Sequence, residues 1–144
     1  MLGRWEQALR IRQNVYSGSL KLYGEEHRET HIDASNYAAT LCLLLRFEEA
    51  KSLLLKNLPV ARHVFGESDR ITLRMRTIYA EALYEDTGAA LEELREAVNT
   101  IEDTVRIARH VFGSAHPTVK GFEEDLKRSQ EALHARETPS PGGA

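Results

Sequence analysis

Histidine is the residue type in this chain whose spacing first suggests chemistry. His27 and His31 lie four positions apart, a separation that places two imidazoles on one face of a helix. Zinc sites use three or four protein ligands, and no cysteine, aspartate or third histidine completes a set at ligand spacing. We therefore interpret His27, together with His116, as holding turns between predicted helices. The sequence predicts neither a metal site nor a cofactor.

No other group of residues has the arrangement of a catalytic site. His63 and His110 occupy equivalent places in two copies of one hexapeptide, which indicates packing or surface positions rather than catalysis. The chain has no glycine-rich phosphate loop and no Gly-x-Ser-x-Gly turn. Its many glutamates stand at helix-surface spacing from lysine or arginine, which supports helices and solubility. We predict that the protein is not an enzyme.

Composition narrows the class of protein. The 144 residues carry a net charge of −3, with 42% hydrophobic and 28% charged residues, which is typical of a globular domain and argues against nucleic-acid or anionic-membrane partners. No apolar run approaches the roughly 20 residues that span a bilayer, and the first residues lack the apolar core of a signal peptide. A single cysteine, Cys42, predicts a reducing, cytoplasmic compartment.

The strongest feature of the sequence is an internal repeat. The hexapeptide at 61–66, Ala-Arg-His-Val-Phe-Gly, returns unchanged at 108–113, and a weaker copy ends at Gly24. We interpret the hexapeptide as the end of a helix, in which Ala and Val pack, Phe fills a gap between repeats and Gly turns the chain. A repeated unit of this length indicates a stacked helical array.

The repeat has a measurable period. The segment 4–8 returns at 46–50, and Tyr37-Ala38 returns at Tyr79-Ala80, in both cases 42 positions later. From Glu96 onward the matching residues lie 47 positions apart, so five residues enter near Gly88. The insertion falls between two predicted helices, where repeat arrays tolerate it.

These patterns predict an all-α fold of about six helices in one array over residues 1–136, with a disordered tail over 137–144. The predicted helices span about 4–22, 30–45, 47–65, 72–86, 91–112 and 117–135.

The alternating helices and the 42-residue period resemble the tetratricopeptide repeat (TPR) of the kinesin-light-chain and nephrocystin type. Three segments carry the resemblance most clearly: Gly24-Glu25-Glu26-His27 with Thr30, Asn36-Tyr37-Ala38, and Arg46-Phe47-Glu48-Glu49-Ala50. The match runs from Arg4 to about Leu133, although Arg28 and Arg70 stand where the family prefers proline. It implies a right-handed α-solenoid of antiparallel helix pairs, whose first helices line a concave peptide-binding surface.

The resemblance also implies which residues form that surface. On the predicted helix 30–45 they are Ile32, Ser35, Asn36, Ala39 and Leu43. On the predicted helix 72–86 they are Arg74, Thr77, Ile78, Glu81 and Tyr84, and on the helix 117–135 they are Glu124, Asp125 and Arg128. A side-chain amide such as that of Asn36 both donates to and accepts from a peptide backbone, and Arg74 has the geometry to hold a carboxylate.

Two functions from different classes remain open at this point. The first is a non-catalytic interaction module that holds an extended peptide or a helix of a partner protein in the groove. The second is a structural subunit that self-associates, as a homodimer, through an apolar stripe of Trp5, Leu9 and Val15 on the first helix. The chain could equally be a fragment of a longer array, or a spacer whose predicted groove is only a solvated face.

Overall fold

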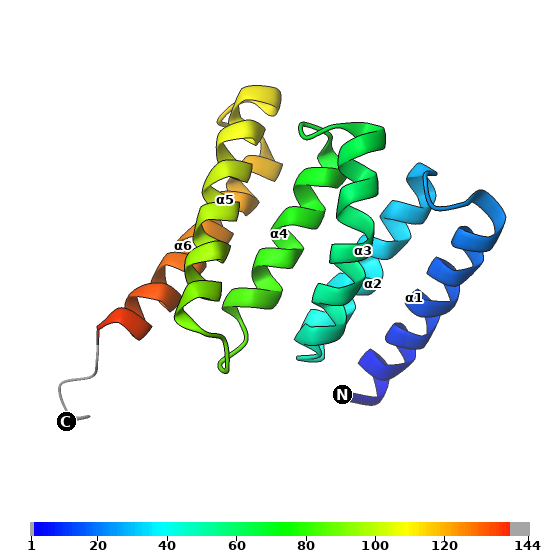
Figure 1. Ribbon diagram of the computed structural model, residues 1–144, viewed down its shortest axis with the longest axis horizontal. Coiled ribbons are helices and arrows are strands. Elements are labelled where there is room, and N and C mark those ends of the chain that lie inside the picture. The colour runs from blue at the N-terminus through cyan, green and yellow to red at the C-terminus, as the bar shows by residue number, and fades with distance from the viewer. Residues whose placement is uncertain (1, 139–144) are drawn as a thin grey trace.

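The computed structural model describes residues 2–138, which form six α-helices and no β-strand (Figure 1). The all-α fold class predicted from the sequence is confirmed for this part of the chain. The helices are α1 (Leu2–Tyr23), α2 (Arg28–Leu43), α3 (Phe47–Phe65), α4 (Arg70–Tyr84), α5 (Leu91–Phe112) and α6 (Pro117–Glu137). None of them combines the length and apolar character needed to cross a bilayer. Residues 139–144 of the predicted tail lie outside the described residues.

The helices pack in two rows. Each helix contacts the next one along the chain, and α4 also contacts both α2 and α6. Within residues 2–138 the backbones of α1, α3 and α5 do not approach one another in this way. In Figure 1, α3 lies in front of α2 and α5 lies in front of α6. The helices α2, α4 and α6 therefore form one closely packed row, which we call the even row.

Helix α4 is the central element of the core. Eleven of its 15 residues are buried. Met75, Ile78 and Ala82 belong to a cluster shared with α1, α2 and α3, whereas Leu73 and Leu83 belong to a second cluster shared with α5 and α6. Because α4 is held from both sides, the side chains that it presents between α2 and α6 have a rigid base.

The helices of the even row begin at side-chain caps. The Nδ1 atoms of His27 and His116 accept the backbone N–H of Glu29 and Thr118, each at 3.1 Å, and Asp69 Oδ1 accepts that of Ile71 at 2.9 Å. A cap satisfies a backbone donor that the first turn leaves free. Helices α2 and α4 therefore begin two residues earlier than predicted, directly after their caps.

The odd-numbered helices end at aromatic residues that contact these caps. Tyr23 stacks on His27 and Phe112 stacks on His116, with ring centroids 4.5 and 4.9 Å apart. The glycines that follow Phe65 and Phe112 adopt φ values of 94° and 91°, which are costly for any residue with a Cβ atom. The aromatic-glycine pair therefore closes each repeat, as the hexapeptide predicted.

At the middle turn, Asp69 replaces histidine and an arginine takes over the stacking role. The guanidinium of Arg28 lies 4.8 Å from the ring centroid of Phe65 and donates to both carboxylate oxygens of Asp69, at 3.2 and 2.6 Å. His31 packs edge-on against the other side of Phe65, with centroids 5.3 Å apart. The turn is therefore held by residues from two successive repeats.

The five inserted residues are divided between a loop and a helix. The connection between α4 and α5 is longer than the connection between α2 and α3, and α5 has 22 residues where α3 has 19. Part of the insertion therefore extends the first turn of α5 instead of staying in the loop. Glu93 supports this turn by accepting the backbone N–H of Ala90 at 3.0 Å.

Two details of the predicted packing are wrong. Val64 and Val111 of the hexapeptide are exposed, and only Ala61 and Ala108 pack in the core. The valines follow the alanines by three positions, and at the end of the helix the neighbouring helices do not cover them. Leu9, predicted as part of an exposed stripe, is only 5% exposed and belongs to the first core cluster. Leu9 therefore cannot contribute to contact with a second copy.

Candidate functional site

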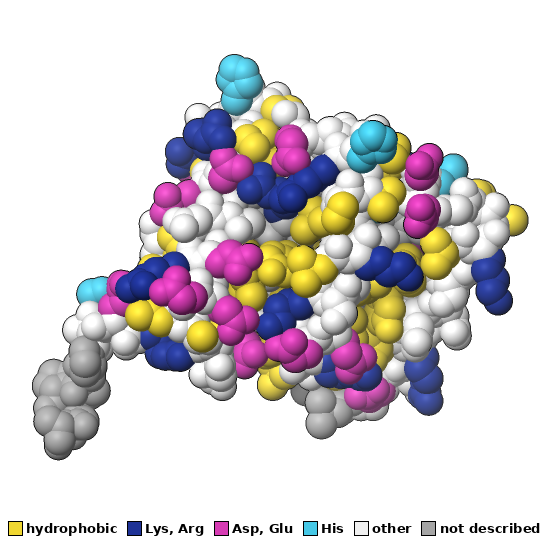
Figure 2. Space-filling model, viewed as in Figure 1, with side chains coloured by type: hydrophobic (Ala, Val, Ile, Leu, Met, Phe, Trp, Pro, Cys, Tyr) yellow, Lys and Arg dark blue, Asp and Glu magenta, His cyan; other side chains and the backbone are white. Residues whose placement is uncertain are grey.

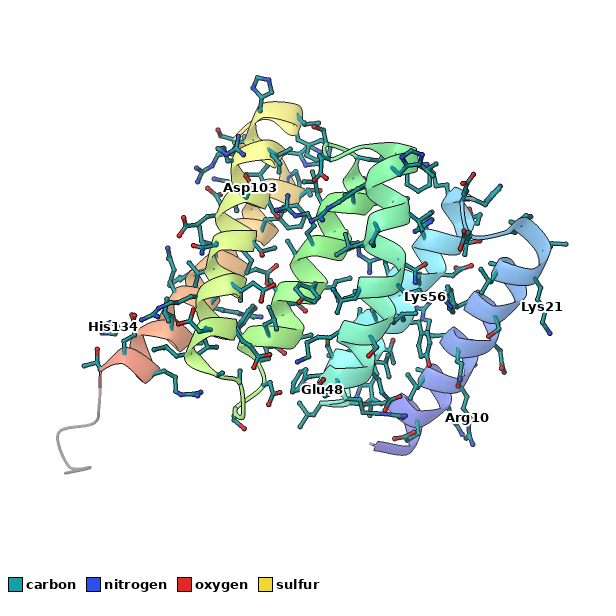
Figure 3. The ribbon with its side chains drawn as sticks, in the orientation of Figure 1. Arg10, Lys21, Glu48, Lys56, Asp103 and His134 are labelled. Atoms are coloured by element: carbon teal, nitrogen blue, oxygen red, sulfur yellow. The ribbon has the colours of Figure 1, made fainter. Side chains whose placement is uncertain are left out.

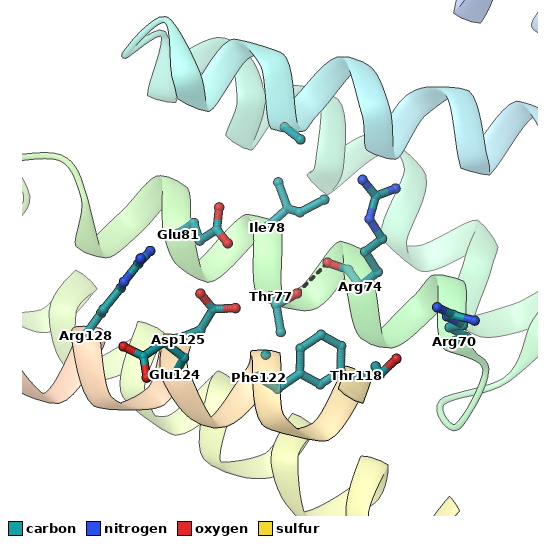
Figure 4. A pocket seen from close by; sticks show the side chains of 12 residues that line it. Arg70, Arg74, Thr77, Ile78, Glu81, Thr118, Phe122, Glu124, Asp125 and Arg128 are labelled. Carbon is teal, nitrogen blue, oxygen red and sulfur yellow. Dashed lines mark hydrogen bonds between the residues drawn. The ribbon is translucent and has the colours of Figure 1, made fainter. Parts of the chain in front are cut away.

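A hollow of about 530 Å³ lies on the even row, with its floor on α4 and its walls on α2 and α6 (Figure 4). We call it the α4 groove. Seven of the nine groove residues predicted from the sequence line it: Ala39, Arg74, Thr77, Ile78, Glu81, Asp125 and Arg128. Glu124, also expected on this face, lines it too. Positions one turn apart share a helix face, which groups the lining residues of each helix. The packing of α2, α4 and α6 then brings the three groups together.

Asn36 and Tyr84 do not line the groove. Asn36 is half-buried on α2, where its backbone carbonyl accepts the hydroxyl of Thr40 at 3.0 Å. Tyr84 is buried in the second core cluster, and its hydroxyl donates to Asp125 Oδ1 at 3.5 Å. Tyr84 therefore belongs to the core shared with α5 and α6 and contacts the acidic end of the groove only through its hydroxyl.

The other residues expected on α2 lie near the groove or outside it. Ile32 and Ser35 line a shallow hollow that shares Arg70 and Arg74 with the groove, while Leu43 is exposed at the end of the helix. Fewer residues of α2 than predicted therefore line the groove, and more residues of α6 than predicted do so.

Four lining residues were not predicted: Arg70, Thr118, Gly121 and Phe122. Arg70 precedes Arg74 by one turn of α4, and the other three precede Asp125 and Arg128 by one or two turns of α6. Extending the i, i+3, i+4, i+7 pattern backward along both helices would have found them.

One end of the groove is basic. Arg70 and Arg74 lie on the first two turns of α4, and Figure 4 shows both at the same end of the hollow. Neither guanidinium forms an ion pair with a carboxylate of residues 2–138. Burial lowers the pKa of Arg74; Glu81 opposes this shift, and Arg12 and Arg70 add to it. An arginine stays protonated at any pH relevant here, so this end holds uncompensated positive charge.

The opposite end is acidic. Burial raises the pKa of Glu81 to about 7, with further contributions from Asp125 and Glu85 and opposing effects of Arg128 and Arg74. Figure 4 shows the Glu81 and Asp125 carboxylates side by side above α6. Among the described residues neither carboxylate has an ion-pair partner. Two carboxylates that share a partly dehydrated space disfavour each other's ionisation.

Asp125 responds to the same environment. Burial raises its pKa to about 6, while Arg128 and the hydroxyl of Tyr84 act in the opposite direction and Glu85 and Glu124 add to the increase. Arg128 is exposed, so water screens its charge. The acidic end therefore carries more negative charge than Arg128 neutralises.

The middle of the groove is apolar. Ile78 and Phe122 present their side chains from α4 and α6 (Figure 4). Ala39 of α2 also lines the groove. The hydroxyl of Thr77 is occupied, because it donates to the backbone carbonyl of Arg74 at 2.8 Å. The groove thus presents a basic end, an apolar middle and an acidic end, in that order along α4.

A second hollow, of about 180 Å³, lies between α3, α4 and α5. We call it the opposite hollow, because Arg76 and Tyr79 face it from the side of α4 away from Thr77 and Glu81. Here the arginine of α4 is paired within the protein. Arg76 Nη2 donates to Asp103 Oδ2 at 2.8 Å, and Figure 3 shows Asp103 on α5. The hydroxyl of Tyr79 donates to Glu96 at 3.3 Å.

Figure 2 shows the face of the molecule that carries α3 and α5. Acidic and basic side chains are interspersed there, with hydrophobic side chains between them and no large area of one sign. This pattern agrees with the paired charges of the opposite hollow.

The histidines have structural contacts. His31 is buried, and its Nε2 lies 2.6 Å from the carbonyl oxygen of Glu25, while His27 caps α2. His63 and His110 are exposed. Within residues 2–138 no group of three histidine, cysteine or acidic side chains has the geometry to hold a metal ion. Burial raises the pKa of the Cys42 thiol to about 12, which leaves it protonated and unreactive.

A third surface feature is an apolar strip on α1. Ile11, Val15 and Leu22 are 62%, 44% and 74% exposed, and together with Gly18 they follow the i, i+4, i+7, i+11 pattern of one helix face. Trp5 is 44% exposed beside this strip. Figure 3 shows that charged side chains such as Arg10 and Lys21 also project from α1.

Searches of protein-family models, of curated proteins and of solved structures found no match to this chain. The function proposed below therefore rests on the geometry of the molecule and on the resemblance described for its sequence.

Proposed function

We propose that the protein is a non-catalytic interaction module that holds a peptide segment of a partner protein in the α4 groove. The observation that carries this proposal is the groove itself: three helices converge on about 530 Å³ of space with an apolar middle and unpaired charges at both ends. Binding sites are typically concave and largely apolar, with a few polar groups that set orientation. The TPR resemblance supports the same proposal, together with a right-handed solenoid arrangement of antiparallel helix pairs.

The proposal is tested with a variant that blocks the groove without disturbing the core. Gly121 lies in the groove wall on α6, is exposed, and has open space where a Cβ atom would be. In Gly121→Gln the new side chain occupies the groove, while the helix gains a residue of higher helix propensity. We expect peptides selected from a random displayed library to lose at least tenfold in affinity.

Gly18→Gln is the matched control. Gly18 is also an exposed helical glycine with open space around it, but it lies on α1 outside the groove. We expect this variant to bind the selected peptides like the parent chain. Failure to select any peptide, or equal binding by Gly121→Gln, would contradict groove binding.

The apolar strip on α1 supports an alternative, in which the chain self-associates as a structural subunit. Trp5 and Val15 of the predicted contact remain exposed, and Ile11 and Leu22 extend the strip. Sedimentation at tens of micromolar decides between the proposals. A dimer that Gly18→Gln dissociates and Gly121→Gln leaves intact supports self-association through α1, and a strict monomer refutes it.

A further inference from the structure

The charge order of the groove restricts which peptide it accepts. On the premise that the α4 groove binds peptides, we infer that it selects a segment in which an acidic, an apolar and a basic side chain follow one another. The acidic side chain contacts Arg70 and Arg74, the apolar one packs between Ile78 and Phe122, and the basic one contacts Glu81 and Asp125.

The unpaired charges are the first argument. On the surrounding surface, arginines such as Arg28 and Arg46 already hold carboxylates of this chain, with oxygens at 2.6 and 2.8 Å. Within the described residues, the two arginines at the basic end of the groove and the two carboxylates at its acidic end have no such partner. Arg74, Glu81 and Asp125 are half-buried, and charge that is partly dehydrated and unpaired is unfavourable. A ligand that supplies both complementary charges relieves this cost at both ends.

The geometry gives the spacing of the ligand. Arg74 and Glu81 are seven residues apart on α4, or about 10 Å at the helical rise, and Arg70 and Glu81 are about 16 Å apart by the same rise. In an extended peptide, positions i, i+2 and i+4 face one side and span about 13 Å. A segment of the form acid-x-apolar-x-base therefore fits between the two charged ends.

The direction of α4 reinforces the same order. Arg70 begins the helix and Glu85 caps its end. The N-terminus of a helix carries partial positive charge and the C-terminus partial negative charge. The backbone thus adds to the side-chain charge at both ends. A uniformly acidic segment would meet Glu81 and Asp125, and a uniformly basic one would meet Arg70 and Arg74, so each loses at one end what it gains at the other.

The inference also predicts that peptide affinity depends on pH, because the acidic end of the groove can be protonated. Glu81 is faced by Arg74 and Glu85 on its own helix, by Asp125 and Arg128 on α6, and by the neutral thiol of Cys42 on α2. Because burial raises the pKa of Glu81 to about 7, a basic side chain must bind the minor, ionised form at pH 6. Affinity should therefore rise about tenfold from pH 6 to pH 8.

The test uses fluorescence anisotropy with labelled peptides whose ends are acetylated and amidated, so that the termini carry no charge. Two probes contain Asp-Ser-Leu-Ser-Lys and its reverse, because the charge order leaves the chain direction open. Two controls carry Asp or Lys at both ends of the motif. We expect one mixed probe to bind at least tenfold more tightly than either control.

Charge reversal in the protein provides the decisive comparison. Glu81→Lys should switch the preference to the probe with two acidic ends, and Arg74→Glu to the probe with two basic ends. Glu81→Gln, which removes the charge without reversing it, should weaken binding of the mixed probe and make its affinity less dependent on pH. Circular dichroism checks that each variant keeps its helical content.

The outcomes separate this inference from the groove proposal. If library peptides bind, lose affinity in Gly121→Gln, and show no charge order or response to charge reversal, then the selectivity is wrong and the groove still binds peptides. If no peptide binds at all, the groove proposal fails and the inference fails with it. A switch of preference in both reversal variants supports the inference.

Discussion

Helix α4 lines two hollows, one on each of its faces, and the two hold their charged groups differently. In the opposite hollow, Arg76 is bound to Asp103 and Tyr79 to Glu96. In the α4 groove, Arg74 and Glu81 lie on one helix face seven residues apart, too far to pair with each other. The buried arginine on one face of α4 therefore has an ion-pair partner within the fold, whereas Arg74 and Glu81 on the other face have none among the described residues.

We expect the largest change in stability from removing the arginine of the opposite hollow that is paired with Asp103. Arg76 is buried, and its Nε and Nη1 atoms have no hydrogen-bond partner in the structure, so its truncation removes packing and leaves Asp103 with less compensation. Arg76→Ala should lower the free energy of unfolding by about 2 kcal/mol. Arg74→Ala, which breaks no ion pair, should change it by less than about 0.5 kcal/mol. Urea denaturation measures both values.

Arg76→Met separates packing from charge. If packing dominates, this variant should recover more than half of the loss, because methionine fills a similar volume without unsatisfied donors. Equal effects of Arg76→Ala and Arg74→Ala would show that the two faces of α4 do not differ in this way.

The second effect concerns the pH dependence of stability. The folded-state pKa of Glu81 is raised from 4.5 to about 7, so between these values the folded chain binds more protons than the unfolded chain. Its stability therefore falls as pH rises through this window. Glu81→Gln removes the effect. Because the carboxylate is only half-buried and water screens much of its interaction, we expect the free energy of unfolding to rise by about 1 kcal/mol at pH 8, well below the full value of the shift, and by little at pH 4.5. Thermal unfolding followed at both pH values tests the sign of this change in stability. A stabilisation confined to low pH would contradict the prediction.

A smaller effect distinguishes a helical glycine in the groove wall from the glycine that ends α3. Gly121→Ala should stabilise the chain by about 0.5 kcal/mol, because the new methyl group enters open space in a helix. Gly66 ends α3 with φ of 94°, so Gly66→Ala should destabilise the chain by about 1 kcal/mol. Denaturant midpoints give both shifts, and two shifts of the same sign would mean that local backbone geometry does not control them.

The smallest effect is expected at Glu96. Its hydrogen bond with Tyr79 is exposed, so Glu96→Gln should change the free energy of unfolding by less than about 0.5 kcal/mol at any pH between 4.5 and 8. This variant is the control for Glu81→Gln, since it removes the same charge from the opposite hollow, where Glu96 lies on α5. A pH-dependent gain as large as that of Glu81→Gln would show that net charge, and not the groove, is responsible.

Much of the groove could be anticipated from the sequence, and particular residues show why. Arg74, Thr77, Ile78 and Glu81 share a helix face by spacing alone, so any fold that keeps α4 helical presents them together. Asn36 and Tyr84 satisfy the same spacing but are displaced, because their orientation depends on how α2 and the last turn of α4 pack against other helices. Gly121 could have been found only by its spacing from Asp125 and Arg128, since a glycine contributes to a groove through the space it leaves open.

The helical class, the period of 42 with its five-residue insertion, and the turns that close each repeat all follow from the order of the residues. These are local properties, set by side-chain periodicity and by the backbone freedom of glycine. Helix packing, in contrast, determines that Leu9 is buried and Val64 exposed, that Arg28 stacks on Phe65 one repeat away, and that Glu81 and Asp125 share one partly dehydrated space. Those outcomes depend on the distance between residues far apart in the chain, which helix packing sets.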